Sequence, residues 1–265
     1  MKKSISFNGA QTFYTIQGSG IPVLLLHGFG EDSSVWENLA SHLIDYKLII
    51  PNLPGSGPSE DLVQKTVSMS DYVAWIALIL KQENIDAVHF VGHSMGGYIA
   101  MEFANRHKDK LGSLTLFHSS AFADDEEKKE TRRKSIVFIE SHGASAFLTT
   151  SIPPLFKDPG LHGAEINKLI EKGNSFSSNT LVQYYKAMIE RKDHASLLST
   201  MNFPVLFIIG EHDKAVPLNI SLKQCYLPAI SFVHILRKSA HMSMFEEPGE
   251  IAIIVNDFLK AVTIG

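Results

Sequence analysis

The sequence has one cysteine, no long apolar run and no excess of basic residues. With only Cys225, the 265-residue chain forms no internal disulfide, which suits a reducing compartment. The longest apolar stretch, residues 72–80, is well short of the ~18 residues that span a bilayer, so no membrane span is expected. A formal net charge of −4 offers no basic surface for nucleic acid. Polar residues follow Lys2 and Lys3, where a signal peptide needs an apolar core, so we expect a cytoplasmic protein.

Short apolar runs alternate with helical patterns over the first 120 residues. The runs are apolar throughout, which is typical of strands covered on both faces in a parallel sheet. Strands are expected at 21–26, 47–50, 87–91 and 111–117, and helices at 36–43, 71–82 (capped by Ser70) and 95–107. The pair Asn8-Gly9 between strand-like runs predicts an N-terminal hairpin. The fold class is therefore α/β, with a mostly parallel twisted sheet and helices on both faces.

The alternation stops at about residue 121 and returns with strands at 205–209 and 231–236. The residues between, 121–198, show helical periodicity and loops but no convincing strand. We expect a core domain of residues 1–120 and 199–265 that carries a helical cap, 121–198. The charged run 124–130 opens a helix with acids first, which complements the helix dipole and indicates a solvated helix face.

A glycine-rich turn follows the expected strand 87–91 and precedes a helix: Gly92-His93-Ser94-Met95-Gly96-Gly97. Strand, tight turn and helix in that order raise a serine hydroxyl out of a sheet and into a cleft. Glycines on either side of Ser94 remove the Cβ atoms that would collide when such a turn closes. The free N–H groups of the following helix point back toward the serine, where an oxyanion can be held.

A serine nucleophile needs a base, and the base needs an orienting carboxylate. In an open parallel sheet these lie beyond the carboxyl ends of strands. Asp213 follows the strand 205–209 and is favoured over its neighbour Glu211, while Asp124 and Asp125 fit better as helix N-terminal charges. His241 lies in a loop between the last strand and a C-terminal helix. The order Ser94, Asp213, His241 leaves room for the helical insertion in its first gap.

With these motifs the chain resembles the α/β-hydrolase fold family, and among its members the cap-bearing, carboxylesterase-like serine hydrolases. The resemblance rests also on His27-Gly28-Phe29-Gly30 and on residues 53–59, with Asn52 where many relatives have Asp. It implies oxyanion donors at the backbone N–H groups of Phe29 and Met95. Similar motifs occur in C–C bond hydrolases and in cofactor-free perhydrolases, so these chemistries stay open.

We therefore expect a serine hydrolase that cleaves a small or medium apolar ester, with no metal and no organic cofactor. The substrate pocket is predicted to be lined by His27, His93, His118, Phe147, Leu155, Tyr184 and Met242. The sequence shows no basic cluster within 121–198 of the kind that would indicate a polyanionic substrate. A monomer or homodimer is expected. A different class of function, a small-ligand sensor whose lid changes shape for a protein partner, remains the alternative to an enzyme.

Overall fold

The structure is a computed structural model that describes residues 1–263. Within that range eight strands form one sheet in the order β1-β2-β4-β3-β5-β6-β7-β8. The strands are β1 (Lys2–Phe7), β2 (Ala10–Gln17), β3 (Ile21–Leu26), β4 (Tyr46–Pro51), β5 (Val88–His93), β6 (Leu111–Phe117), β7 (Val205–Gly210) and β8 (Ser231–Leu236). From β4 through β8 all neighbours are parallel, whereas β2 pairs antiparallel with both β1 and β4. The predicted fold class is confirmed.

The strand sequences explain their places in the sheet. The run Val23-Leu24-Leu25-Leu26 in β3 is fully buried, as expected for a central strand covered on both faces. The edge strand β8 instead leaves most of its residues exposed. The hairpin between β1 and β2 turns at Asn8 and Gly9, both with positive φ, which is the backbone that an Asn-Gly turn provides.

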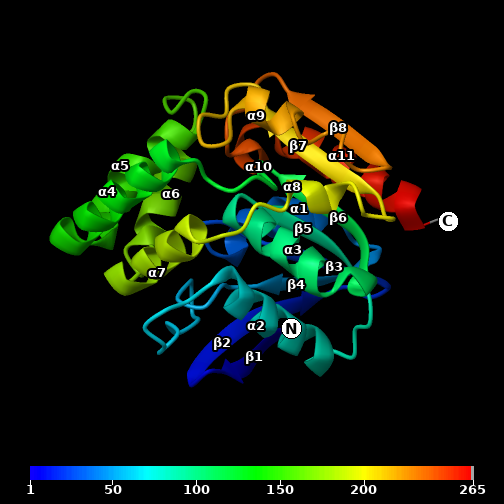
Figure 1. Cartoon of the computed structure of the whole chain (residues 1–265), viewed down its shortest axis with the longest axis horizontal. Helices are drawn as coiled ribbons and strands as arrows, with labels where there is room; N and C mark the ends of the chain where they lie inside the picture. The colour runs from blue at the N-terminus through cyan, green and yellow to red at the C-terminus, as the bar shows by residue number, and fades with distance from the viewer. Residues whose placement is uncertain (264–265) are drawn as a thin grey trace.

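Helices cover both faces of this sheet (Figure 1). The pair α2 (Met69–Gln82) and α3 (Met95–Arg106) lies on one face, and α1 (Glu37–His42) with α11 (Pro248–Thr263) lies on the other. The remaining elements of the core are short: η1 (Ser33–Trp36), η2 (Lys108–Lys110), α9 (Leu218–Leu222) and α10 (Ser243–Glu246). No helix within residues 1–263 combines the length and apolar content required to cross a bilayer.

The start of α2 differs from the prediction. Ser68, rather than Ser70, precedes the helix, and its backbone N–H donates to Asp71 Oδ2 at 2.8 Å. A capping box of this kind satisfies donors that the first helical turn leaves free. Ser70 lies inside the helix, where its hydroxyl donates to Glu102 Oε1 at 2.9 Å. The prediction that Ser70 caps this helix was wrong.

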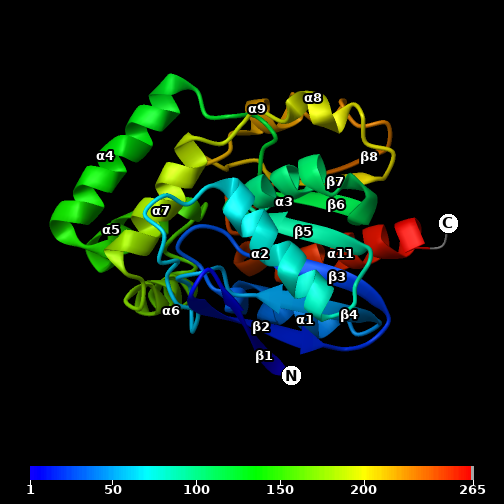
Figure 2. The ribbon, with the colours of Figure 1, turned by 60° about the horizontal axis from the view of Figure 1, so that its bottom comes forward.

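A helical segment connects β6 to β7, and we call it the β6–β7 insertion, residues 118–204. It contains α4 (Glu126–His142), α5 (Ala144–Ser151), η3 (Pro153–Leu155), α6 (Gly163–Gly173), α7 (Ser178–Ile189) and α8 (Ala195–Leu198), and no strand. Figures 1 and 2 show α4 to α7 grouped together beside one end of the sheet, while α8 lies back over the core. The insertion thus adds a helical wall next to the strand ends that carry the candidate site.

Candidate active site

Ser94 occupies the sharp turn between β5 and α3. Its backbone has φ +49° and ψ −114°, a conformation that side-chain-bearing residues rarely adopt. A Cβ placed on Gly92 would lie 2.5 Å from the carbonyl oxygen of Gly96, and one on Gly96 would collide with the carbonyl of Leu26. Both glycines are therefore required by close backbone approaches. The turn holds Ser94 at the N-terminus of α3, where it lines a cavity.

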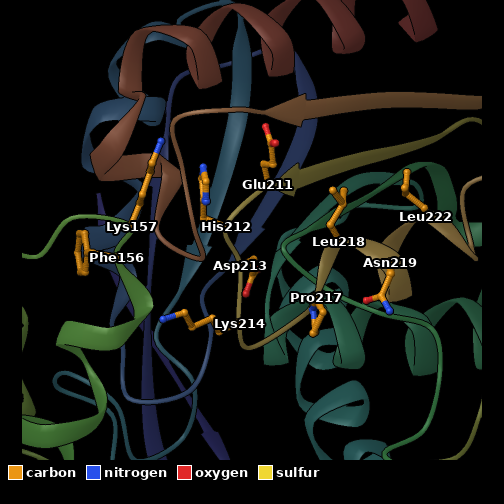
Figure 3. Close-up of a pocket in the computed structure, with 10 residues that line it drawn as sticks. All are labelled: Phe156, Lys157, Glu211, His212, Asp213, Lys214, Pro217, Leu218, Asn219 and Leu222. Carbon is orange, nitrogen blue, oxygen red and sulfur yellow. The ribbon is translucent and has the colours of Figure 1, made fainter.

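Asp213 lies in the loop after β7, with its carboxylate almost fully used. Oδ1 accepts the backbone N–H groups of Ala215 and Val216, both at 2.8 Å, and Oδ2 lies 2.7 Å from His241 Nδ1. Burial opposes the charged form, but the adjacent His241 outweighs it and the pKa of Asp213 falls well below its usual range. Glu211 is exposed, and Figure 3 shows its side chain pointing away from that of Asp213. An ionised Asp213 is thus fixed next to Nδ1 of His241.

His241 follows β8 and is 3% exposed. Because the Nδ1–H group of His241 donates a hydrogen bond to Asp213, the ring with this single proton carries its lone pair on Nε2. No group among residues 1–263 hydrogen-bonds to Nε2. Ser94 and His241 line the same cavity of about 700 Å³, and within the described residues no hydrogen bond joins the Ser94 hydroxyl to the ring. The structure therefore couples Asp213 directly to His241 and brings Ser94 to the cavity that His241 lines.

The backbone N–H groups of Phe29 and Met95 are both free of partners within residues 1–263. Met95 is the first residue of α3, so its N–H has no intrahelical acceptor. The Phe29 ring stacks on Tyr185 with centroids 4.3 Å apart, which holds the loop after β3 in place. Two free donors beside a serine are the elements that a developing oxyanion requires.

A buried ion pair between Glu31 and His93, which the sequence does not reveal, connects the loop after β3 with the loop that carries His241. Glu31 Oε2 accepts the Gly28 backbone N–H at 2.7 Å and lies 3.0 Å from His93 Nδ1. The other ring nitrogen, His93 Nε2, lies 3.0 Å from the carbonyl oxygen of His241. Both ring nitrogens face acceptors, so both carry protons and His93 is an imidazolium. Burial opposes this charge, but Glu31 outweighs it and raises the pKa of His93.

His118 lies on the other side of Asp213, with Nδ1 3.4 Å from Oδ2 and Nε2 2.7 Å from Ser243 Oγ. Complete burial lowers the pKa of His118 to about 4, so its ring is neutral at physiological pH. The potential ligand atoms of His118, Asp213 and His241 lie within 4.8 Å of one another. Since both Asp213 oxygens already accept hydrogen bonds, this group is arranged to hold an imidazole in place.

The predicted pocket residues lie in two kinds of place in the structure. Leu155 lines the cavity, and it also accepts the His241 backbone N–H at 2.9 Å. The other six are buried and are not among the residues that line this cavity, so their contact with substrate stays a prediction: His27, His93, His118, Phe147, Tyr184 and Met242. A histidine or aromatic near a strand end can equally well satisfy the interior, and sequence does not tell the two apart.

Two of these residues show what they do instead. His27 Nε2 accepts the Leu53 backbone N–H at 3.0 Å, which ties the loop after β3 to the loop after β4. The Tyr184 hydroxyl donates to the Pro54 carbonyl at 2.7 Å and links the β6–β7 insertion to that same loop. Asn52 contributes as well, because its Oδ1 accepts the Ser33 backbone N–H at 2.9 Å.

Charged residues of the β6–β7 insertion also reach the cavity, contrary to expectation. Lys128 and Arg132 of α4, together with Arg191 after α7, line it around the buried carboxylate of Asp124. The expected solvated face holds for most of residues 124–130, which are exposed or half-buried, but Asp124 is buried and Lys128 lines the cavity. The expectation that the insertion carries no basic cluster was wrong. Lys128 and Arg132 lie four residues apart on one helix, but nothing in the sequence placed Arg191 beside them.

Comparisons with known proteins agree with this architecture. Residues 21–138 match a family model described as alpha/beta hydrolase fold. A 2-hydroxy-6-oxononadienedioate/2-hydroxy-6-oxononatrienedioate hydrolase from Burkholderia vietnamiensis is 24% identical over 93% of this chain and 90% of its own length. A thermophilic esterase from Thermogutta terrifontis, solved with malate bound, superposes with a TM-score of 0.91 at 25% identity, covering 99% of both chains. An enol-lactonase from Burkholderia xenovorans superposes with a TM-score of 0.89 at 20% identity, covering 97% of this chain and all of the other.

Proposed function

Because this chain belongs to the α/β-hydrolase fold family, we propose that it is a serine hydrolase that cleaves a carboxylic ester through an acyl-enzyme on Ser94. The observation that carries the proposal is the 2.7 Å contact between His241 Nδ1 and Asp213 Oδ2, next to a cavity that Ser94 also lines. This arrangement leaves His241 Nε2 as the base that faces the cavity. The esterase from Thermogutta terrifontis, which matches the whole fold, supports the same reaction class.

In the proposed reaction, the Ser94 oxygen attacks the ester carbonyl while His241 Nε2 takes its proton. Asp213 keeps the proton on Nδ1 and stabilises the imidazolium that forms. The N–H groups of Phe29 and Met95 hold the oxyanion, and each donor of this kind contributes about 3–4 kcal/mol to the transition state. His241 then protonates the leaving alcohol, and a water that it activates cleaves the acyl-enzyme.

In the same proposal residues 121–198 of the β6–β7 insertion act as a cap over a core made of residues 1–120 and 199–265. Its apolar side chains Leu148, Ile152 and Met188 line the cavity opposite Ser94. They provide a surface for the hydrocarbon part of a small or medium ester. This site requires no metal and no organic cofactor for acyl transfer.

A second chemistry, hydrolysis of a C–C bond next to a carbonyl, is favoured by one observation. The curated relative from Burkholderia vietnamiensis, similar over nine-tenths of both chains, is named a 2-hydroxy-6-oxononadienedioate/2-hydroxy-6-oxononatrienedioate hydrolase, and the oxo group in that name is a carbonyl. The same serine, base and oxyanion donors serve that reaction. The two chemistries therefore differ in the substrate that the cavity accepts, and not in the machinery at Ser94.

The proposal is tested with p-nitrophenyl esters of increasing acyl length, assayed with the unmodified protein and two serine variants. Ser94→Ala removes the proposed nucleophile. Ser120→Ala is the matched control, since Ser120 lines the same cavity and, within residues 1–263, its hydroxyl makes one hydrogen bond, which it accepts from the Phe122 backbone N–H. We expect turnover to fall to background in Ser94→Ala and to persist in Ser120→Ala. Equal turnover in both variants would contradict the nucleophile; no ester turnover by the unmodified protein would favour the C–C chemistry.

A further inference from the structure

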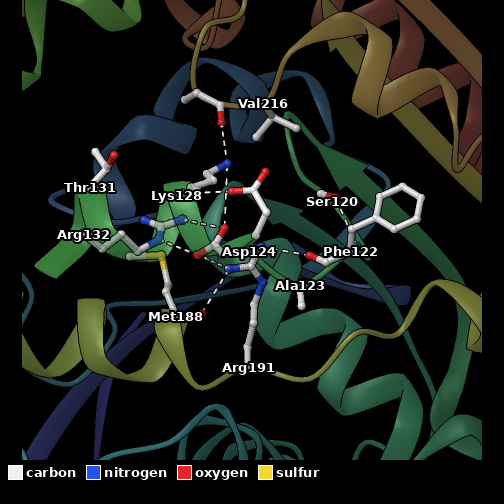
Figure 4. Close-up of polar contacts among 12 residues, drawn as sticks. Ser120, Phe122, Ala123, Asp124, Lys128, Thr131, Arg132, Met188, Arg191 and Val216 are labelled. Carbon is white, nitrogen blue, oxygen red and sulfur yellow. Dashed lines mark hydrogen bonds and ion pairs between the residues drawn. The ribbon is translucent and has the colours of Figure 1, made fainter.

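Three cations and one carboxylate gather on the wall of the cavity that contains Ser94 (Figure 4). Arg132 Nε lies 2.6 Å and Arg191 Nη1 2.8 Å from Asp124 Oδ2, while Lys128 Nζ lies 3.9 Å from Oδ1. Lys128 also donates to the Ala215 carbonyl at 2.8 Å, in the loop that positions Asp213. We call the side chains of Lys128, Arg132 and Arg191, together with that of Tyr98, the cationic niche.

The buried part of this niche carries more positive than negative charge. The side chains of Arg132 and Arg191 are only 12% and 6% exposed, and they share the single carboxylate of Asp124, which is fully buried. Buried charges are ordinarily paired, because an uncompensated charge away from water is costly. Arg191 also donates to the carbonyl oxygens of Met188 and Phe122, but within residues 1–263 one guanidinium charge has no buried carboxylate of its own.

The other charged groups on the cavity wall do not remove this excess. Glu31 is paired with His93. Asp125 and Glu127 are exposed on the first turn of α4, and Lys214 is exposed at the opposite rim with Lys223. Charges in contact with water are screened and hold a bound ion weakly. The surplus that a ligand meets inside the cavity is positive.

The excess of positive charge also affects the buried side chain of Tyr98. It lies four residues after Ser94, hence on the same side of α3, and is 4% exposed. Its hydroxyl makes no hydrogen bond within residues 1–263, while the Arg191 guanidinium lies 3.9 Å above its ring centre. Burial raises the pKa of Tyr72 and Tyr184, but the three cations outweigh burial at Tyr98 and lower its pKa. An unpartnered donor thus stands in a field that favours an anion.

We propose that the cationic niche binds a carboxylate of the substrate, so that the enzyme acts on monoesters of short dicarboxylic acids. Arg132 and the Tyr98 hydroxyl donate to that carboxylate, and the apolar wall of the insertion covers the chain that links it to the ester. Ser94, Tyr98 and Arg132 line the same cavity, so the ester and the carboxylate of one short molecule can lie in it together, and glutarate monoesters serve as the probe. This inference rests on the proposed hydrolase function and adds the substrate class to it.

The test measures binding without turnover, by isothermal titration calorimetry on the Ser94→Ala protein. Monomethyl glutarate, which carries one carboxylate, is compared with dimethyl glutarate, which carries none. We expect the monoester to bind at least about ten-fold more tightly, the effect of one charge-assisted contact. Arg132→Met and Tyr98→Phe, each added to Ser94→Ala, are expected to lower this ratio.

Arg133→Met is the matched control, because Arg133 is the next residue of α4, is 48% exposed and pairs with Glu130 outside the cavity. It removes the same charge from the chain and is expected to keep the ratio. Equal or tighter binding of the diester would overturn the proposal, as would an equal loss in Arg132→Met and Arg133→Met. If Arg132→Met does not fold, the ratio in Tyr98→Phe decides. Hydrolysis of monomethyl glutarate by the unmodified protein tests the hydrolase function separately, since binding to Ser94→Ala needs no reaction.

Discussion

Replacing Glu31 by glutamine tests the buried ion pair beneath the active site. Glutamine keeps an oxygen for the Gly28 N–H but removes the charge that faces His93. His93 then remains as an unpaired buried cation, or loses a proton and leaves one of its two acceptors, the side-chain oxygen at position 31 or the His241 carbonyl, without a donor. A broken buried pair costs about 3–5 kcal/mol and an unsatisfied buried acceptor about 1–3 kcal/mol. We expect Glu31→Gln to lower the free energy of unfolding by about 3 kcal/mol.

The pH dependence of that difference follows from the two pKa shifts. The pKa of His93 is raised in the folded protein, so its contribution is complete below about 6.5 and is lost as pH rises through the folded pKa. The pKa of Glu31 is lowered, chiefly by His93 against the effect of burial, so its contribution is present above about 4.5 and is lost as pH falls. The stability difference between the unmodified protein and Glu31→Gln is therefore largest between about pH 4.5 and 6.5.

Urea unfolding between pH 5 and 8 measures this difference, with fluorescence of the buried Trp36 and Trp75 as the signal. Glu37→Gln is the control, since Glu37 is 66% exposed and only pairs with Lys168 on the surface. We expect it to change stability by less than about 1 kcal/mol. A loss below about 1 kcal/mol in Glu31→Gln, or a loss that is constant from pH 5 to 8, would refute the assignment of His93 as an imidazolium.

Three further changes probe the turn, the base and the contact between insertion and core. Gly92→Ala is expected to prevent folding, because its Cβ meets the Gly96 carbonyl, and its circular dichroism spectrum is expected to lack the signal of folded helices. Gly163→Ala, where a Cβ has open space, is expected to give the spectrum of the unmodified protein. Asp213→Asn is expected to lower kcat about 10⁴-fold in an ester assay while thermal stability shows a folded protein; a loss under ten-fold would contradict its role. Tyr184→Phe, which leaves the Pro54 carbonyl without its donor, is expected to destabilise by about 1–3 kcal/mol in urea unfolding, and a neutral result would count against that contact.

The sequence predicts most of the sheet, because buried parallel strands are short apolar runs that stand out between helical patterns. It also places Ser94, Asp213 and His241 at strand ends, where parallel topology gathers residues from distant parts of the chain. Ser68 is recognisable as the cap of α2 through Asp71 three residues later, a signal that Ser70 lacks. Tyr98 is similarly within reach of a sequence argument, four residues after Ser94 on one helix.

The interior contacts of the site are not readable in the same way. Glu31 meets His93 because the loop after β3 lies next to the end of β5, and Arg191 reaches Asp124 beside Arg132 because α4 packs against α7. Helical periodicity gives the buried face of each helix but not the partner or the angle at which it packs. Whether a polar side chain faces a cavity or the packed interior depends on that geometry, so the sequence does not show that His118 and Tyr184 are buried.

In the proposed reaction Ser94 becomes a nucleophile because His241 takes the proton of its hydroxyl. Labelling with a fluorophosphonate, followed by peptide mapping in a mass spectrometer, measures this directly. We predict one adduct on the peptide that contains Ser94, its loss in Ser94→Ala, and labelling slowed at least about 1,000-fold in His241→Ala. An adduct on another residue, or labelling of His241→Ala at the rate of the unmodified protein, would contradict it.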